Sequence, residues 1–106
     1  MELVTIKIDL SRSEPVEIRR SEAEKVTRAY VHPAEGVAVQ TKRLFRPLML
    51  GPASGLYSLI SGDRYATDDE IRLGVEALLG ELRKQLQTCW DMEARIREEW
   101  LGEVDE

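Results

Sequence analysis

The carboxyl-terminal third of this 106-residue chain is the feature that most limits the folds available to it. Residues 81–101 contain neither proline nor glycine, and Thr67 stands three residues before Glu70, which is the spacing of a helix capping box. Apolar side chains then recur at intervals of three and four residues, as they do on one face of a helix. These patterns predict an amphipathic helical segment over residues 67–101.

This segment fits two architectures. It forms either one helix, about 50 Å long at about 1.5 Å per residue, or two helices with a break near residues 87–91, where Thr88 and Asp91 could cap the second helix. One long or kinked helix is favoured, because a turn between antiparallel helices usually contains glycine. A helix of that length would extend beyond the rest of the chain and leave its apolar stripe exposed in a monomer. The sequence therefore predicts a homodimer, with an interface formed by Leu82, Leu86, Cys89, Ile96, Trp100 and Leu101.

The amino-terminal residues favour strands. The first strand has an alternating pattern, with Val4, Ile6, Ile8 and Leu10 on one side and Thr5, Lys7 and Asp9 on the other, as in a half-buried strand. Residues 37–41 alternate in the same way. Residues 21–31 fit two structures, because Ser21 and Glu24 have the spacing of a capping box whereas the β-branched residues that follow favour an extended chain. The strand interpretation is preferred, so residues 1–43 are expected to form an antiparallel β meander.

Residues 44–66 are expected to connect this sheet to the helix. Pro47 and Pro52 cannot donate ladder hydrogen bonds, and Gly51 and Gly55 permit close backbone approach. Residues 102–106 form an acidic tail that is expected to fray. The predicted fold is a single α+β domain over residues 1–106, in which a small antiparallel sheet of about three to five strands precedes a long carboxyl-terminal helix or helical pair.

Charge is unevenly distributed along the chain. The formal net charge is −5, with ten basic and eight acidic residues in positions 1–66 and with five basic and twelve acidic residues in positions 67–106. An acidic helical face attracts partners with basic surfaces. The sequence thus suggests an acidic partner-binding face formed by Glu81, Asp91, Glu98 and Glu99.

A second hypothesis rests on the basic residues. Cations that surround an exposed aromatic ring are typical of surfaces that bind nucleic acid, where the cations neutralise phosphates and the ring stacks on a base. Such a group occurs here around Phe45. The candidate basic patch consists of Arg19, Arg20, Lys42, Arg43 and Arg46.

Motifs for chemistry are weak. Ser54, His32 and Asp63 are the residues from which a triad could be assembled, but Ser54 lacks the Gly-x-Ser-x-Gly spacing of a nucleophile elbow. Gly51 and Gly55 are not followed by the Gly-Lys-Ser/Thr of a phosphate-binding loop. The single histidine and the single cysteine, Cys89, do not make a conventional metal site, so we expect no metal. Because none of these motifs is complete, we also expect no catalytic residue and no cofactor. A small enzyme or ligand-binding protein, with a pocket near the connector, is the third hypothesis.

The sequence also suggests where the protein works. Its first residues lack the charge and hydropathy pattern of a secretory signal, and no apolar run reaches the length of about 18 residues that spans a membrane. We therefore expect a cytoplasmic protein without a membrane partner. The leading hypothesis is a non-enzymatic protein–protein interaction module, a small acidic regulator or inhibitor that acts by surface binding to a basic partner.

Overall fold

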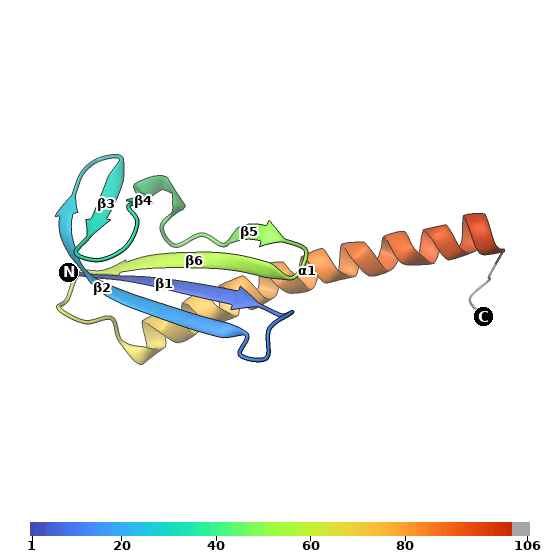
Figure 1. Ribbon diagram of the computed structural model, residues 1–106, viewed down its shortest axis with the longest axis horizontal. Coiled ribbons are helices and arrows are strands. Elements are labelled where there is room, and N and C mark those ends of the chain that lie inside the picture. The colour runs from blue at the N-terminus through green and yellow to red at the C-terminus, as the bar shows by residue number, and fades with distance from the viewer. Residues whose placement is uncertain (103–106) are drawn as a thin grey trace.

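The computed structural model describes residues 1–102 and has an α+β fold, as predicted (Figure 1). The expected acidic tail lies almost entirely outside the described residues. A six-stranded antiparallel sheet precedes one long helix, α1. The elements are β1 (Glu2–Asp9), β2 (Val16–Val26), β3 (Tyr30–Pro33), β4 (Val39–Gln40), the short 3-10 helix η1 (Thr41–Arg43), β5 (Leu48–Gly51), β6 (Ser54–Ser61) and α1 (Asp68–Leu101).

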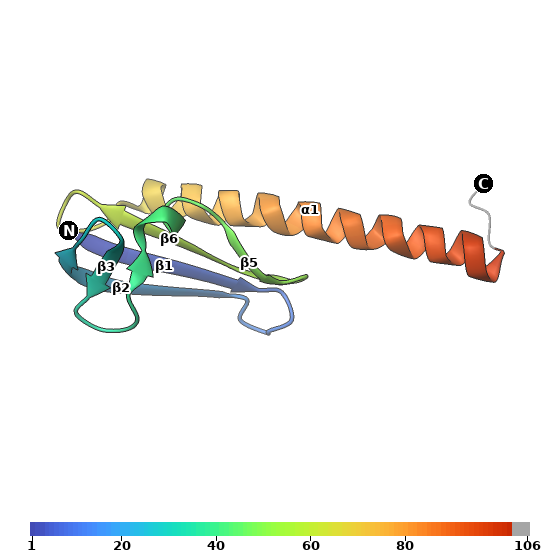
Figure 2. The same ribbon diagram turned by 90° about the horizontal axis from the view of Figure 1, so that it is seen from above.

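The sheet has the strand order β4-β3-β2-β1-β6-β5. Strands β1 to β4 pair with their neighbours in chain order, as expected of a meander. Residues 21–31 contain no helix: they form the end of β2, a turn at residues 27–29 and the start of β3. The register of β2 against β3 shifts between Ala23 and Lys25. Helix α1 covers one face of the sheet, and the end of the sheet that carries β3 and β4 curls toward the other face (Figure 2).

The strand count is higher than the predicted three to five. Residues 44–66, expected as a connector, contain both β5 and β6, and β6 lies inside the sheet between β1 and the edge strand β5. Pro47 and Pro52 flank β5 and remain outside both strands. The prolines are therefore compatible with strands here, because they occupy the boundaries and not the ladders.

The core lies between the sheet and the first half of α1. Val4, Ile6 and Ile8 of β1 point toward the helix and pack with a cluster that includes Leu78 and Leu82. Gly74 is also buried against the sheet. A Cβ atom at residue 74 would lie 2.9 Å from Ile6 Cδ1, so the absence of a side chain lets the helix approach β1 closely.

Helix α1 is a single helix and has no break near residues 87–91. The predicted capping box begins it, since Glu70 N donates to Thr67 Oγ1 and Thr67 N donates to Glu70 Oε1, both at 3.2 Å. Gly102 ends it with a φ of 67° and donates its N–H to the carbonyl oxygen of Arg97. Two local signals that are legible in the sequence therefore determine the helix ends.

Candidate functional site

The second half of α1 projects beyond the sheet (Figure 1). Gly74, Leu78 and Leu82 are buried against the strands, Leu86 is half-buried, and every residue in positions 87–101 is exposed. The described chain accordingly measures 58 × 26 × 20 Å. The projecting part of the helix makes no core contacts within its own chain.

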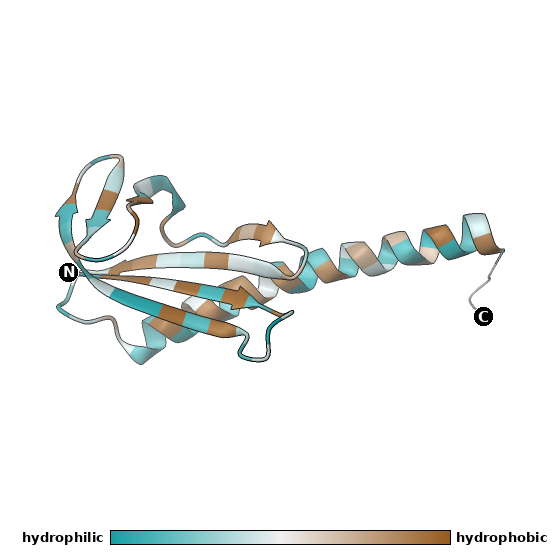
Figure 3. Cartoon of the chain, in the orientation of Figure 1, coloured by the Kyte–Doolittle hydropathy of each residue, from teal (hydrophilic) through white to brown (hydrophobic). Residues whose placement is uncertain are grey.

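The apolar stripe of α1 continues onto the projecting half without changing face. Leu78 and Leu82 lie in the core, and successive steps of seven, seven and four residues from Leu82 reach Cys89, Ile96 and Trp100 on the same side of the helix. Ile96 and Trp100 are 52% and 81% exposed. Figure 3 shows brown, hydrophobic stretches of ribbon among teal, hydrophilic ones along the projecting part of the helix.

The predicted interface residues therefore fall into two groups. Leu82 is 1% exposed and belongs to the core of its own chain, and Leu86 lies at the edge of that core. The other four are exposed and could meet a partner without any change in the fold. They are Cys89, Ile96, Trp100 and Leu101.

The projecting half carries a small negative charge. Residues 87–101 contain two basic and four acidic side chains, so their formal net charge is −2. Two ion pairs one helical turn apart connect four of these six charges: Arg97 with Glu93 at 3.1 Å and Arg95 with Glu99 at 3.8 Å. Just before this part of the helix, Lys84 pairs with Glu81 at 3.2 Å.

Two of the four residues of the predicted acidic face are engaged in ion pairs within the helix. Glu81 and Glu99 are engaged in the ion pairs with Lys84 and Arg95. Asp91 and Glu98 are seven residues apart and share the side of the helix opposite the apolar stripe. Asp91 Oδ1 accepts a hydrogen bond from Gln87 Nε2 at 3.0 Å. Only Asp91 and Glu98 therefore remain together as an outward acidic pair.

A cleft of about 600 Å³ lies on the face of the sheet that is turned away from α1. Its floor includes Leu3 and Thr5, which alternate along β1 with the residues that face the helix. Leu56 and Ser58 of β6 continue the floor, and the Thr5 and Ser58 hydroxyl oxygens lie 3.2 Å apart in a hydrogen bond. The walls come from β3, from residues 35–38 and from the segment that joins β4 to β5.

Four residues of the predicted basic patch line this one cleft, although they come from distant parts of the sequence. The fifth, Lys42, lines a smaller neighbouring depression. Glu35 is the only carboxylate among the described residues of the lining. The four are Arg19, Arg20, Arg43 and Arg46.

The four arginines differ in what else they contact. Arg19 donates to Glu17 at 2.9 Å, and Arg20 donates to Glu2 at 2.9 Å. Within residues 1–102, Arg43 and Arg46 have neither an ion pair nor a side-chain hydrogen bond. Their guanidinium groups are thus available to an anion in the cleft.

The segment that carries Arg43 and Arg46 is held against β6 by its backbone. Leu44 forms a β-bridge with Ser58, and Phe45 N donates to the Ser58 carbonyl oxygen at 2.8 Å. Phe45 has a φ of 60°, which bulky residues rarely adopt. This left-handed residue changes the chain direction between the two arginines and lets both side chains line the same cleft.

Gln40 contributes a polar atom that has no partner. Its side chain lines the cleft, and its Oε1 atom is buried without a hydrogen-bond partner among the described residues. Buried polar groups are nearly always hydrogen-bonded, because an unsatisfied group loses its interaction with water without compensation. Gln40 therefore offers an unused hydrogen-bond acceptor at this wall.

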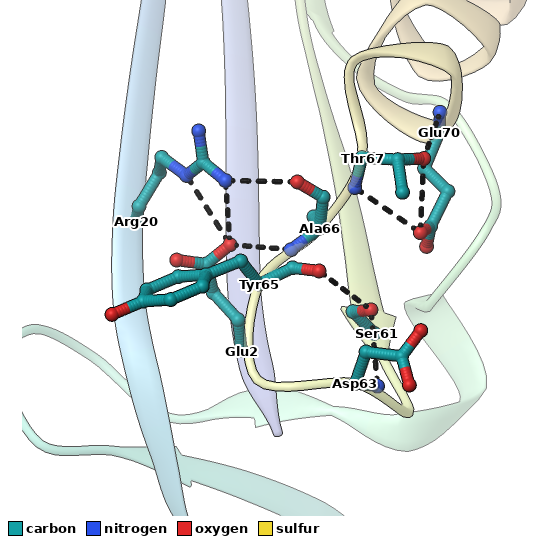
Figure 4. Close-up of polar contacts among 8 residues, drawn as sticks. All are labelled: Glu2, Arg20, Ser61, Asp63, Tyr65, Ala66, Thr67 and Glu70. Atoms are coloured by element: carbon teal, nitrogen blue, oxygen red, sulfur yellow. Dashed lines mark hydrogen bonds and ion pairs between the residues drawn. The ribbon is translucent and has the colours of Figure 1, made fainter.

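A polar network at one end of the two middle strands, β1 and β2, fixes Arg20 and the start of α1 (Figure 4). Glu2 Oε1 accepts hydrogen bonds from Arg20 Nη2 at 2.9 Å and from Ala66 N at 2.8 Å, and Arg20 Nη2 also donates to the Ala66 carbonyl oxygen at 3.0 Å. The Arg20 hydrogen bond holds the pKa of the Glu2 carboxyl below its ordinary value, although burial acts in the opposite direction. The network ties β1 and β2 to the residue before the helix cap.

The three residues considered for a triad are not brought together. Ser54 begins β6 and Asp63 follows its other end, so the length of the strand separates them. His32 lies on β3, and none of the three lines the cleft. Among the described residues, no group of three or more His, Cys, Asp and Glu side chains is arranged to hold a metal ion.

The cleft itself was not predicted from the sequence. The predicted patch located four of its cations, and the alternation of Thr5 with apolar residues had placed that hydroxyl on the side away from the core. The contribution of Gln40, Glu35 and Ser58 had no sequence signal. It depends on the curl of the sheet and on a segment that crosses β6.

Comparisons of the chain with protein-family models, with curated proteins and with solved structures gave no match. In residues 1–102, no helix has the length and apolar character needed to cross a membrane.

Proposed function

We propose that the chain is a non-enzymatic protein–protein interaction module that acts as a homodimer joined through the projecting half of α1. The supporting observation is the exposed apolar stripe on residues 87–101, which continues the face that packs in the core. A helix segment without tertiary packing gains little stability from propensity alone. Burial of Ile96 and Trp100 against a partner would supply the missing stabilisation.

A second copy of this chain is the partner that fits best. The projecting half has a formal net charge of only −2, and four of its six charged side chains are joined in ion pairs, so the repulsion between two such segments is small. Its ion pairs lie along the helix, and they leave the stripe of Cys89, Ile96 and Trp100 apolar except for Glu93. A dimer formed on this stripe would direct Asp91 and Glu98 outward, and there we expect a basic protein partner to dock.

Regulation or inhibition of that partner, in the cytoplasm, is part of the same proposal. Cys89 is an exposed free thiol on the stripe, and a reducing compartment would keep it from forming disulfides. Whether the partner is activated or inhibited would depend on which of its surfaces binds Asp91 and Glu98.

The dimer is tested by measuring molecular mass in solution for two single substitutions. Ile96→Glu places a charge in the stripe, and Ala94→Glu places the same charge on the far side of the helix. We expect the native protein and Ala94→Glu to sediment as dimers and Ile96→Glu to sediment as a monomer. Neither residue contacts the core, so the circular dichroism of the folded body should be retained.

Two results would contradict the proposal. The first is a native protein that stays monomeric at the highest concentration measured. The second is equal dissociation by both substitutions, which would indicate a general effect of added charge and not a contact at the stripe. Docking through Asp91 and Glu98 is tested separately by salt dependence, because electrostatic association weakens as ionic strength rises.

A further inference from the structure

We infer that the cleft on the open face of the sheet binds a nucleotide-sized organic phosphate, with the phosphate held by Arg43 and Arg46. The volume of about 600 Å³ lies within the range of small-molecule sites. This site is separate from the projecting helix, because its floor lies on the face of the sheet away from α1. The inference does not depend on the dimer.

Charge is the first argument. The whole chain has a net charge of −5, yet the cleft is lined by four arginines and one carboxylate, and the ion pairs of Arg19 with Glu17 and of Arg20 with Glu2 neutralise only two of the four. Like charges gathered in a concave site repel one another, and an anionic ligand relieves that repulsion. Arg43 and Arg46 have no ion-pair partner within residues 1–102, and guanidinium groups bind phosphate through paired hydrogen bonds.

The backbone supports the same reading. The segment between β4 and β5 adopts a left-handed conformation at Phe45 and is anchored to Ser58. Conformations of this kind cost energy and are often found where a site requires a fixed geometry. Here the result is that Arg43 and Arg46, three residues apart, both line the cleft.

The rest of the lining suits an organic body attached to the phosphate. Leu3 and Leu56 provide an apolar floor, and Tyr30 provides an aromatic ring at the wall. Gln40 Oε1 is an unused acceptor, so the ligand should carry a hydroxyl or amino group that donates to it. A phosphate, a flat or apolar body and a hydrogen-bond donor together describe a nucleotide more closely than an inorganic anion.

The probe is adenosine monophosphate, titrated into ¹⁵N-labelled protein and followed by amide chemical shifts. We expect saturable shifts at residues 40–46 and in β1 and β6. Adenosine and inorganic phosphate, titrated separately, should each bind about tenfold or more weakly, because each lacks one half of the interaction. Inorganic phosphate that binds as tightly as the nucleotide would overturn the inference.

Substitutions identify the groups that bind. Arg43→Gln with Arg46→Gln should weaken binding about tenfold or more, whereas Arg72→Gln with Arg83→Gln removes the same charge from exposed helix positions and should leave the affinity unchanged. Gln40→Leu should also weaken binding, and it removes a buried unsatisfied group, so the fold should persist. The unshifted remainder of each spectrum reports folding.

Other outcomes would overturn the inference. Absence of saturable shifts would show that the cleft is not a nucleotide site, and so would equal losses in the two double variants. Binding of a single-stranded oligonucleotide with much higher affinity than the mononucleotide would assign the cleft to nucleic acid instead. None of these results bears on dimer formation, which is measured without ligand.

Discussion

At the scale of single residues, Glu2 is notable as a buried carboxylate whose hydrogen bonds connect three elements. The residue is only 7% exposed, and its carboxylate joins Arg20 of β2 to the backbone of Ala66 just before α1. Neither contact was visible in the sequence, where Glu2 was simply a polar residue at the start of a strand. The Glu2 side chain thus links β1 and β2 to the start of α1, because it binds residues that are 18 and 64 positions away in the sequence.

The Glu2 network predicts a dependence of stability on acid. The pKa of Glu2 is lowered in the folded state from an ordinary value of 4.5, so its contribution is complete above that value and is lost as the pH falls through the lower folded pKa. Glu2→Gln should lower the free energy of unfolding at pH 7 by about 1 to 3 kcal/mol. Urea unfolding at pH 7 and at pH 3 measures this, and the difference between native and variant proteins should shrink in acid.

A matched substitution for Glu2 is Glu22→Gln, because Glu22 pairs with Glu2 across β1 and β2 but is exposed. Its removal should change stability little at either pH. A difference between native protein and Glu2→Gln that stays constant from pH 7 to pH 3 would mean that the carboxylate charge contributes nothing and that only the shape of the side chain is needed.

At the scale of elements, the long helix was readable from the sequence, and the interior strand β6 was not. Helix α1 has local signals at both ends and a stripe along its length. Strand β6 is paired on both edges and has Gly55, Tyr57, Ser58, Leu59 and Ser61 all buried, so it lacks the alternation by which a half-exposed strand is recognised. Its small residues and the prolines before it are more typical of a connector.

The two glycines inside α1 allow a prediction about helix packing. A Cβ at residue 74 would lie 2.8 Å from Tyr57 Cδ1 and 2.9 Å from Ile6 Cδ1, whereas a Cβ at residue 80 meets no described atom within 4 Å. Gly80→Ala should therefore stabilise the protein by about 1 kcal/mol through helix propensity. Gly74→Ala should destabilise it by about 1 to 3 kcal/mol, because the added methyl group pushes α1 away from the sheet.

Chemical denaturation of the two glycine variants under identical conditions provides the measurement. Each variant serves as the control for the other, since both make the same chemical change in the same helix. Equal stabilisation by both substitutions would show that α1 is not packed closely against Ile6 and Tyr57.

At the scale of the whole molecule, the two halves of α1 have different surroundings. The first half completes a core with β1 and β6, and the second half lies beyond it with an apolar stripe exposed. The stripe and the prediction of association were legible in the sequence, because the helix was too long for the remaining chain. The cleft was not, because it depends on how the sheet curls and on where Phe45 turns the chain.

This division predicts the behaviour of a chain that ends at Leu86. It keeps Gly74, Leu78 and Leu82 and therefore the whole core, so we expect it to fold with a cooperative thermal transition. If the projecting half forms the dimer, the melting temperature of the full chain should rise with protein concentration, because association stabilises the folded state by mass action. The shortened chain should melt at one temperature at every concentration, which differential scanning calorimetry would measure.

Two outcomes would contradict this division of α1. A shortened chain that fails to fold would mean that residues 87–101 stabilise their own subunit. If the melting temperature of the full chain does not depend on concentration, the exposed stripe of Cys89, Ile96 and Trp100 does not bind a second copy of the chain.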